Sequence, residues 1–299
     1  MDTTPAPPAT AGDFHAHARH LRALAYRMLG SRADAEDVVQ DAWLRWQATD
    51  HASVLHARAF LSQVVTRLCL DRLQSARARR EHYVGTWLPE PLVNEELDPG
   101  PEAATEFAQD VSMAFMLALE RLSPLERAAF LLHDVFDLDF DEVADRLGRS
   151  AAACRQLASR ARAHVRAGYA RCEVKQEDSQ RLLLAFTQAL AVGDVDGLAR
   201  TLAADAVFVA DGGGLVSAVP RPLMGAALIA KAMVGFRKLY DLSRMTMEPA
   251  VVNGLPGWVQ HDIDGTPLSA ASIRMGADGL IAAIHVVRNP QKLAHLRRG

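Results

Sequence analysis

The chain has 299 residues, 49% of them hydrophobic and 23% charged, with a formal net charge of −3 at pH 7. This length predicts two or three domains, and the composition is ordinary for a soluble globular protein. No run approaches about 18 consecutive apolar residues, which excludes a membrane-spanning helix. Residues 1–12 lack a basic start and an apolar core, so they are interpreted as a disordered lead-in and not as a signal peptide.

Cysteine and histidine spacing gives no metal site. Cys69, Cys154 and Cys172 show neither CxxC nor metal-ligand spacing, which favours a reduced, cytoplasmic protein. The cluster of histidines at 15, 17 and 20 has no acidic or cysteine partner nearby, and a solvated helix start explains it better than a metal. We expect no metal and no cofactor.

Residues 13–82 are predicted to form a first block of helices. Apolar residues recur at helical spacing from Leu21 to Leu29, and Gly30 then ends that helix. Ser31, three residues before Asp34, is typical of a capped start for a helix through Trp46. A third helix spans 57–81, and residues 54–82 hold six arginines against two acids, a local balance of +4. This positive charge is concentrated at the end of the third helix.

Residues 83–110 are predicted to be an acidic linker. From Thr86 to Asp110 the sequence has four prolines, seven carboxylates and no lysine or arginine. It nevertheless contains Trp87-Leu88-Pro89-Glu90-Pro91, and a solvated linker has no use for a tryptophan followed by a leucine. Our hypothesis is that Trp87, Leu88 and Pro89 pack on the C-terminal part of the chain. Packing of Trp87 on the end of the preceding helices is the alternative.

Residues 111–172 are predicted to form a second helical block that contains a helix-turn-helix. Ser123, Pro124 and Glu126 are typical of a helix start, and Gly148 ends a short amphipathic helix. Ser150 then caps a longer helix, which is the arrangement of many DNA-binding proteins. Residues 144–171 hold seven arginines and one acid, a balance of +6. Arginine-rich helices can simply be solvated surfaces. Two such modules joined by a tether favour the other interpretation, that the protein binds DNA at two places.

Residues 177–299 are predicted to form an α+β domain. A helix over 180–194 precedes a β-like run at 206–211, and a helix over 225–236 precedes four further runs near 247–253, 257–264, 268–275 and 280–287. Helices followed by a meander of strands indicate one curved sheet.

These segments resemble a known family. Residues 25–46 and 57–81 resemble domain 2 of bacterial extracytoplasmic-function (ECF) sigma factors, and the stretch from Leu119 to Val165 resembles domain 4. The WLPEP stretch, "DGGG" and "NPQKL" are similar to motifs of the subgroup with a SnoaL-like C-terminal domain, although Gln291 stands where that subgroup usually has Asp. The resemblance therefore implies two all-α sigma domains and a cone-shaped α+β regulatory domain. The motif residues are Trp87, Leu88, Pro89, Glu90, Pro91, Asp211, Gly212, Gly213, Gly214, Asn289, Pro290, Gln291, Lys292 and Leu293.

The resemblance also implies partners and site residues. The partners would be promoter DNA and core RNA polymerase, through its β′ clamp and β flap. The residues that would bind the clamp are Asp34, Glu36, Asp37, Gln40 and Asp41. Those that would meet the −10 promoter element are Arg67, Arg72, Arg77, Arg79 and Arg80. Those that would read the −35 element are Ser150, Arg155, Gln156, Ser159 and Arg160. A tether of some 25 residues extends to roughly 80–90 Å, enough to join the two contacts.

Three other functions remain open for the sequence. An isomerase or hydrolase in the C-terminal cone would use Asp211, His261, Asp262 or His285 as acid and base. An apolar small molecule sensed in the cone is a second reading, and a stand-alone helix-turn-helix repressor is the third. No spacing in the sequence demands catalysis. We therefore expect a sigma factor and not an enzyme, and we expect the C-terminal domain to modulate the activity of this sigma factor.

Overall fold

The computed structural model describes residues 12–81, 83–94, 111–168, 176–239 and 242–298, and within these ranges not the side chains of 74–81, 167–168, 176–180 and 242. The described chain forms two compact units. The first comprises the chain up to Glu81 together with Ala118–Gly168, and the second comprises residues from 82 to Leu117 together with the chain from 169 onwards. The N-terminal lead-in, Cys172 and the acidic segment 95–110 lie outside the described residues.

The first unit begins with three packed helices, α1 (Asp13–Leu29), α2 (Arg32–Gln47) and α3 (Ala57–Glu81). As predicted, Gly30 ends α1 with φ of 69°, and the Ser31 hydroxyl accepts a hydrogen bond from the Asp34 amide at the start of α2. The core of these helices includes Leu21, Leu24, Val38, Trp46 and Leu61, all with 0% exposure. Trp46 is thus a core residue, and Trp43 packs edge-on against Phe14 with ring centroids 4.9 Å apart.

The predicted helix-turn-helix is present in the same unit. α5 (Met113–Glu120) is followed by α6 (Pro124–Phe130), a π-helical turn (Leu131–Val135), α7 (Phe140–Leu147) and α8 (Ala151–Gly168). Ser123 and Glu126 form the predicted capping box on α6. Gly148 ends α7 in the left-handed conformation, and the Ser150 hydroxyl accepts from the Ala153 amide at 3.2 Å to begin α8.

The two helical blocks pack together within this unit. Helix α3 contacts α6 and α7, and the buried Arg127 side chain donates to the Arg27 carbonyl at 2.9 Å. Arg127 also pairs with Glu120, and burial lowers the pKa of its guanidinium to about 9. The Gln63 amide donates to the Asp145 carbonyl at 3.3 Å. A buried arginine and a polar contact therefore join the blocks, together with a ring contact between His20 and Phe136.

The second unit is built on a mixed sheet of six strands. The strands are β1 (Leu202–Asp211), β2 (Leu223–Met224), β3 (Met245–Val252), β4 (Leu255–Asp262), β5 (Pro267–Met275) and β6 (Ile281–Val287). Their order in the sheet is β2-β1-β6-β5-β4-β3, with β1 and β6 parallel and the other pairs antiparallel. The predicted meander is the run β3 to β6. The predicted fold class, two all-α parts and one α+β part, is confirmed.

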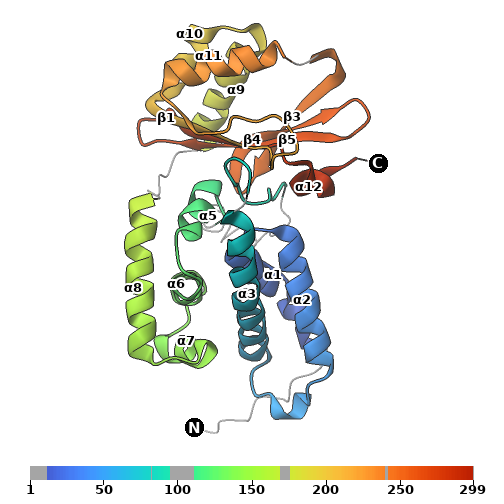
Figure 1. Ribbon diagram of the computed structural model, residues 1–299, viewed down its shortest axis with the longest axis vertical. Coiled ribbons are helices and arrows are strands. Elements are labelled where there is room, and N and C mark those ends of the chain that lie inside the picture. The colour runs from blue at the N-terminus through green and yellow to red at the C-terminus, as the bar shows by residue number, and fades with distance from the viewer. Residues whose placement is uncertain (1–11, 82, 95–110, 169–175, 240–241, 299) are drawn as a thin grey trace. The chain divides into compact units, whose positions relative to one another are not determined.

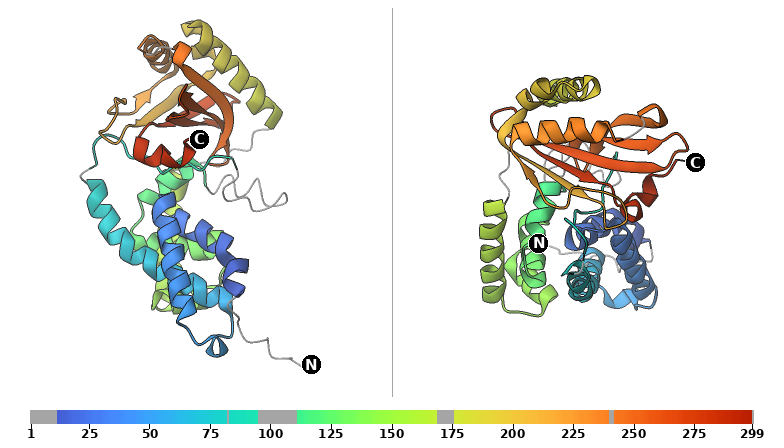
Figure 2. Two further views of the ribbon diagram at one scale, coloured as in Figure 1. Left: turned by 90° about the vertical axis from the view of Figure 1, so that its right-hand side faces the viewer. Right: turned by 45° about the horizontal axis from the view of Figure 1, so that its top comes forward.

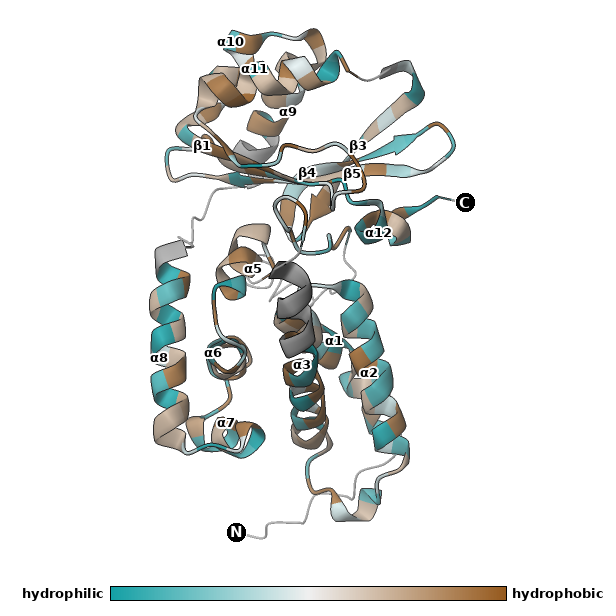
Figure 3. Cartoon of the chain, viewed as in Figure 1, coloured by the Kyte–Doolittle hydropathy of each residue, from teal (hydrophilic) through white to brown (hydrophobic). Residues whose placement is uncertain are grey.

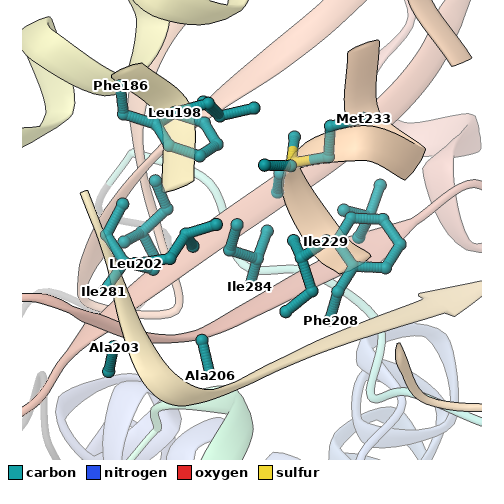
Figure 4. Close-up of a cluster of buried hydrophobic side chains, with 14 of the residues drawn as sticks. Phe186, Leu198, Leu202, Ala203, Ala206, Phe208, Ile229, Met233, Ile281 and Ile284 are labelled. Carbon is teal, nitrogen blue, oxygen red and sulfur yellow. The ribbon is translucent and has the colours of Figure 1, made fainter. Parts of the chain in front are cut away.

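Three helices cover one face of this sheet (Figure 1 and Figure 2): α9 (Gln176–Val192), α10 (Val195–Arg200) and α11 (Ala226–Arg237). Alternate residues of the strands face these helices and form an apolar core, in which Phe186 and Ile229 meet Phe208 and Ile284 (Figure 4). Because α9, α10 and α11 adjoin β1 and β2 in sequence, this face is assembled from neighbouring segments.

Segments remote in sequence cover the opposite face. They are residues 83–94, Met113 at the start of α5, and the C-terminal stretch with α12 (Pro290–Leu293). The apolar cluster on this face joins Leu88, Val93 and Met113 to the strand residues Val209, Val252, Val259, Ala270 and Val287 and to Leu293. Sequence patterns missed α10 and α12, which are short.

Candidate functional sites: the linker dock and the nucleic-acid interface

The face of the sheet just described carries a site that we call the linker dock. It comprises residues 83–94 and 111–113 and the residues that they contact, which are the 211–214 turn, Asn253 and residues 287–296. The buried carboxylate of Asp211 lies at its centre. Asp211 has 0% exposure and ends β1. Its Oδ1 accepts from the Tyr83 hydroxyl at 2.7 Å and the Gly213 amide at 2.9 Å. Its Oδ2 accepts from the Leu88 amide at 2.9 Å and the Lys292 ammonium at 2.7 Å. Four donors satisfy the carboxylate, which is the condition for burying a charge at low cost.

Leu88 supplies the apolar part of the dock. Its side chain has 0% exposure, and its carbonyl accepts from Lys292 while its amide donates to Asp211. Full burial of a leucine stabilises by about 1.5–3 kcal/mol. The backbone and the side chain of one residue thus join the linker to both charged groups of the dock.

Two aromatic rings of the linker surround the Lys292 ammonium. Its nitrogen lies 4.5 Å from the ring centroid of Trp87 and 4.9 Å from that of Tyr83. A cation over an aromatic face is stabilised by about 0.5–2 kcal/mol, more when water is excluded. Burial, with the hydrogen bond to Asp211, raises the pKa of the Tyr83 hydroxyl, so that it acts as a donor at neutral pH. The aromatic residue in the acidic linker is therefore paired with a lysine of the C-terminal segment.

The Asp211–Gly214 turn and the Asn289–Leu293 segment fit together closely. A Cβ atom at Gly213, where φ is 62°, would lie 2.2 Å from the Asn289 amide nitrogen, and one at Gly214 would lie 2.9 Å from Val84. Gly212 is similarly restricted by the Val216 carbonyl at 2.3 Å. The Asn289 side chain donates to the Tyr83 hydroxyl at 2.9 Å, so these glycines permit contact of the turn with Asn289 and the linker.

The charge at position 291 is not needed for the ion pair of the dock. Asn289 caps α12 by accepting from the Gln291 amide at 3.0 Å, and Pro290 occupies the first turn. The Gln291 backbone serves the cap, while Lys292 makes the ion pair with Asp211 at 2.7 Å.

The Pro89–Pro91 stretch is buried against the C-terminal end. Glu90 is 7% exposed, with a carboxylate oxygen 3.6 Å from Nδ1 of His295. The other ring nitrogen of His295 lies 3.1 Å from the Pro91 carbonyl.

Asn253 holds both ends of the acidic segment. Its side-chain oxygen accepts from the Leu92 amide at 3.0 Å, and its side-chain nitrogen donates to the Val111 carbonyl at 2.8 Å. Leu92 to Asn94 also pair with the end of β3, through the Asn253 amide to the Leu92 carbonyl and the Asn94 amide to the Val251 carbonyl. Residues 92 and 111 therefore meet at one amide group.

The dock contains residues that sequence patterns did not indicate: Tyr83, Asn253 and His295. Asn253 sits in an Asn-Gly turn with φ of 51°, and that turn signal was the one available clue. Nothing in the sequence shows that the amide of a turn would hold two remote carbonyl and amide groups.

The candidate catalytic groups do not gather in a cavity. By alternation along the strands, Asp211, His261 and His285 face the linker side of the sheet, and Asp211 is fully occupied there. A ring nitrogen of His261 lies 3.1 Å from the Leu296 carbonyl, and Asp262 lies 4.0 Å from Arg244. Burial, and then Arg274, lower the pKa of His285 to about 4. No pair of these groups forms an acid and base in a shared cavity within the described residues.

Helix α2 is largely hydrophilic (Figure 3), and an arginine of α3 pairs with the acids on its surface. Glu36, Asp37 and Gln40 are exposed, and Asp34 and Asp41 are half-buried. Arg72 reaches Asp37 and Asp41 at 3.2 Å and Asp34 at 3.6 Å. The structure thus joins a residue expected at the −10 element to three expected at the polymerase. Arg67 is exposed, and Arg77, Arg79 and Arg80 lie outside the residues whose side chains are described.

The exposed face of α8 carries the residues expected at the −35 element. Arg155, Gln156, Ser159 and Arg160 are all exposed, whereas the Ser150 hydroxyl is used in the helix cap. The Arg155 guanidinium lies 5.4 Å from the centroid of the Phe140 ring. Arg160 pairs with Glu126 at 2.9 Å, with 58% of its side chain exposed. Arginine and amide side chains are of the types that can contact base edges in a major groove.

Metal sites and membrane spans are not found in the described residues. No three His, Cys, Asp or Glu side chains come together as a metal site there. His20, from the histidine cluster, lies 3.2 Å from the Ser62 hydroxyl and 3.3 Å from Arg58. None of the described helices is long and apolar enough to cross a membrane.

Two family models match the helical blocks: Sigma-70 region 2 over residues 14–79 and Sigma-70, region 4 over residues 112–165. ECF RNA polymerase sigma factor SigJ of Mycobacterium tuberculosis is 39% identical over 290 residues, which cover 94% of this chain and 92% of SigJ. The probable ECF RNA polymerase sigma factor SigI of that species is 34% identical over 63% of this chain and 65% of its own. The crystal structure of M. tuberculosis SigJ matches 95% of this chain and 98% of its own with 36% identity and a TM-score of 0.75.

Proposed function

The chain belongs to the ECF RNA polymerase sigma factors, which direct core RNA polymerase to promoters for transcription initiation, and we propose how its parts divide this work. The acidic face of α2 binds the β′ clamp, the end of α3 meets the −10 element, and α8 reads the −35 element while its module contacts the β flap. The exposure of the α2 acids and of the α8 polar row supports these roles.

Arg72 has a different role from Arg67 in this proposal. Because Arg72 pairs with three carboxylates of α2, it fixes the acidic face that binds polymerase. Arg67 is the exposed arginine of the pair and is the one that contacts promoter phosphates.

The promoter contacts are tested by DNase footprinting of the full chain with core polymerase. Gln156→Ala removes a side chain that can read adenine, and we expect about 1–3 kcal/mol weaker binding, confined to the −35 region. Arg200→Ala, an exposed arginine of the third part, is the matched control and leaves the footprint unchanged. An unchanged −35 footprint in Gln156→Ala rules out this residue as a reader.

The linker dock restrains initiation. One observation supports this: the Asn253 amide bonds to both Leu92 and Val111, so two points of the tether between the DNA-binding modules are held together. Sixteen residues, 95–110, extend to about 50–60 Å, but only when their ends are free to separate. Release of the dock returns this length to the tether, and the two promoter contacts can then be made together.

The restraint is tested by run-off transcription with purified core polymerase on the upstream region of the protein's own operon and a wider set of genomic templates. Asp211→Ala removes the carboxylate at the centre of the dock, and we expect initiation to rise several-fold. Asp205→Ala, an exposed acid on the same strand, is the control and initiates like the unaltered chain. Equal or lower initiation by Asp211→Ala contradicts the restraint, and no initiation by any variant contradicts the promoter function itself.

Catalysis plays no part in this proposal, and the site of action is the cytoplasm, where polymerase and chromosome are. The packing of Asp211 and His285 on the linker side of the sheet supports a structural use of these groups.

A further inference from the structure

A cavity of about 690 Å³ lies in the second unit, between α9, α11 and the sheet. Its walls are mainly large apolar side chains, among them Leu190, Phe208, Met233, Phe236, Trp258 and Val286. Figure 4 shows Phe208 and Met233 beside the buried core on this face. Sites for small molecules are typically about 300–1,000 Å³ and predominantly apolar, so this cavity has the size and lining of one.

Two polar groups in the wall have donor capacity to spare, the Gln260 amide and the Arg237 guanidinium. The Ser269 hydroxyl donates to the Gln260 side-chain oxygen at 2.7 Å, while the Gln260 amide nitrogen meets the sulfur of Met247, a weak acceptor, at 3.9 Å. Nε of Arg237 is buried and has no hydrogen-bond partner among the described residues. A buried donor without a partner is costly, and an acceptor on a ligand would satisfy it.

We propose that this cavity binds a small, largely apolar molecule with one anionic or hydrogen-bond-accepting group, and that its occupancy strengthens the linker dock on the other face of the sheet. The apolar walls take the body of the molecule, and Arg237 and Gln260 take its polar group. The regulatory meaning of this site rests on the proposed restraint of initiation. The bound molecule would be the ligand that controls that restraint.

The cavity and the dock share two stretches of backbone. On β1, Ala210 lines the cavity and the next residue, Asp211, is the centre of the dock. The chain then passes from Gly213 at the dock to Ser217 and Pro220 in the cavity wall.

The end of β6 alternates in the same way. Val286 and Arg288 line the cavity, whereas Val287 and Asn289 belong to the dock. The Arg288 guanidinium donates to the Ser217 carbonyl and joins the two stretches. A molecule packed on this wall holds the Asp211 turn and Asn289 in their docked positions, and by linkage the docked linker favours the bound molecule.

The experiment uses the full chain and the fluorescent probe 8-anilinonaphthalene-1-sulfonate, an apolar anion. We expect saturable binding of one probe per chain. Ala232→Phe fills the cavity from α11 and weakens binding at least tenfold, while Leu228→Phe, on the exposed side of the same helix, leaves binding unchanged. Arg237→Met keeps the bulk of the side chain but removes the charge, and weakens binding several-fold even if Ala232→Phe fails to fold.

The coupling is read by hydrogen exchange of residues 83–94 with and without the probe. We expect exchange to slow several-fold when the cavity is filled, in the unaltered chain and in Leu228→Phe. Absence of saturable probe binding overturns the proposal, and it is the result expected if a segment of the chain itself fills the cavity. Probe binding that both Ala232→Phe and Arg237→Met retain also overturns it. Binding without slower exchange overturns the coupling. Neither readout involves polymerase, so failure here is distinct from failure of the promoter function.

Discussion

The two faces of the six-stranded sheet are covered in different ways. The helix face is a continuous apolar core formed by segments adjacent in the chain, with Phe186, Ile229 and Ile284 fully buried. The linker face is covered by residues 83–94 and 290–296, more than 100 residues from one another along the chain, and its centre is an ion pair between Asp211 and Lys292.

The two faces therefore differ in role: the helix face stabilises the folded domain, and the linker face is the one that regulates initiation. Apolar burial between neighbouring segments forms early and holds the third part together, because local contacts cost little loop entropy. The linker is held by an apolar cluster that includes Leu88 and by the Asp211–Lys292 ion pair, and a partner that competes for these contacts can displace it. The four predictions below test whether the linker face opens while the helix face stays intact.

Asp211→Ala has the largest expected effect. It leaves the Lys292 ammonium and the Tyr83 hydroxyl without their buried partner, and breaking a buried pair costs about 3–5 kcal/mol. Hydrogen exchange of residues 83–94 should rise by at least a hundredfold while α11 keeps its protection. Asp205→Ala should change neither segment. Loss of protection in both segments would show that the two faces are not independent.

Leu88→Ala tests the apolar part of the dock. Truncation of a fully buried leucine costs about 2–5 kcal/mol, so exchange of the linker should rise at least tenfold. Val84→Ala, 67% exposed in the same segment, is the control and should have no measurable effect. Equal effects of the two substitutions would contradict the assigned burial of Leu88.

Acid should destabilise the sheet through His285. Burial lowers the pKa of this residue to about 4 from an ordinary 6.5, so the unfolded chain takes up the proton first. The contribution of His285 to stability is therefore complete above about pH 6.5, falls as the pH drops towards 4, and amounts to about 3 kcal/mol. Urea unfolding of His285→Gln, followed by exchange in β6, should depend less on pH across that window. His56→Gln, an exposed histidine, should retain the full dependence.

Trp87→Leu has the smallest expected effect. It keeps much of the apolar bulk but removes the ring over Lys292, a loss of about 1 kcal/mol. Exchange of the linker should rise about fivefold, and added salt should not abolish the difference because the pair is partly shielded from solvent. An effect as large as that of Asp211→Ala would place the main stabilisation in the ring.

The sequence was sufficient to predict most helices and most strands, because their signals are local, but not the short helices α10 and α12. Ser31, Ser123 and Ser150 each cap the helix that their position predicts, and Gly148 ends α7 as expected. The unusual Trp87-Leu88 pair within an acidic stretch was enough to suggest packing on the C-terminal part.

What the sequence could not predict was pairing between remote segments. Arg72 was predicted to contact DNA, and in the structure it pairs with acids of α2. This pairing could not be predicted, because nothing in the local sequence of Arg72 shows which helix it faces. The amide of Asn253 reads as an ordinary turn residue, although it joins Leu92 to Val111. Such contacts depend on the fold as a whole.

The most direct test of the restraint is to lock the dock with a disulfide. Val93 and Val252 lie opposite each other in an antiparallel bridge, and the hydrogen bonds flank the pair, so this is the closely spaced type of pair in which a disulfide fits. The Val93→Cys, Val252→Cys chain would be oxidised, half of it reduced again, and both halves added to core polymerase, with Val93→Cys alone as the control.

Run-off initiation by the oxidised double variant should be at least tenfold lower than by its reduced form, with no such difference in the control. Equal initiation by the oxidised and reduced forms would show that the linker need not leave the dock, and the account of the restraint would be wrong.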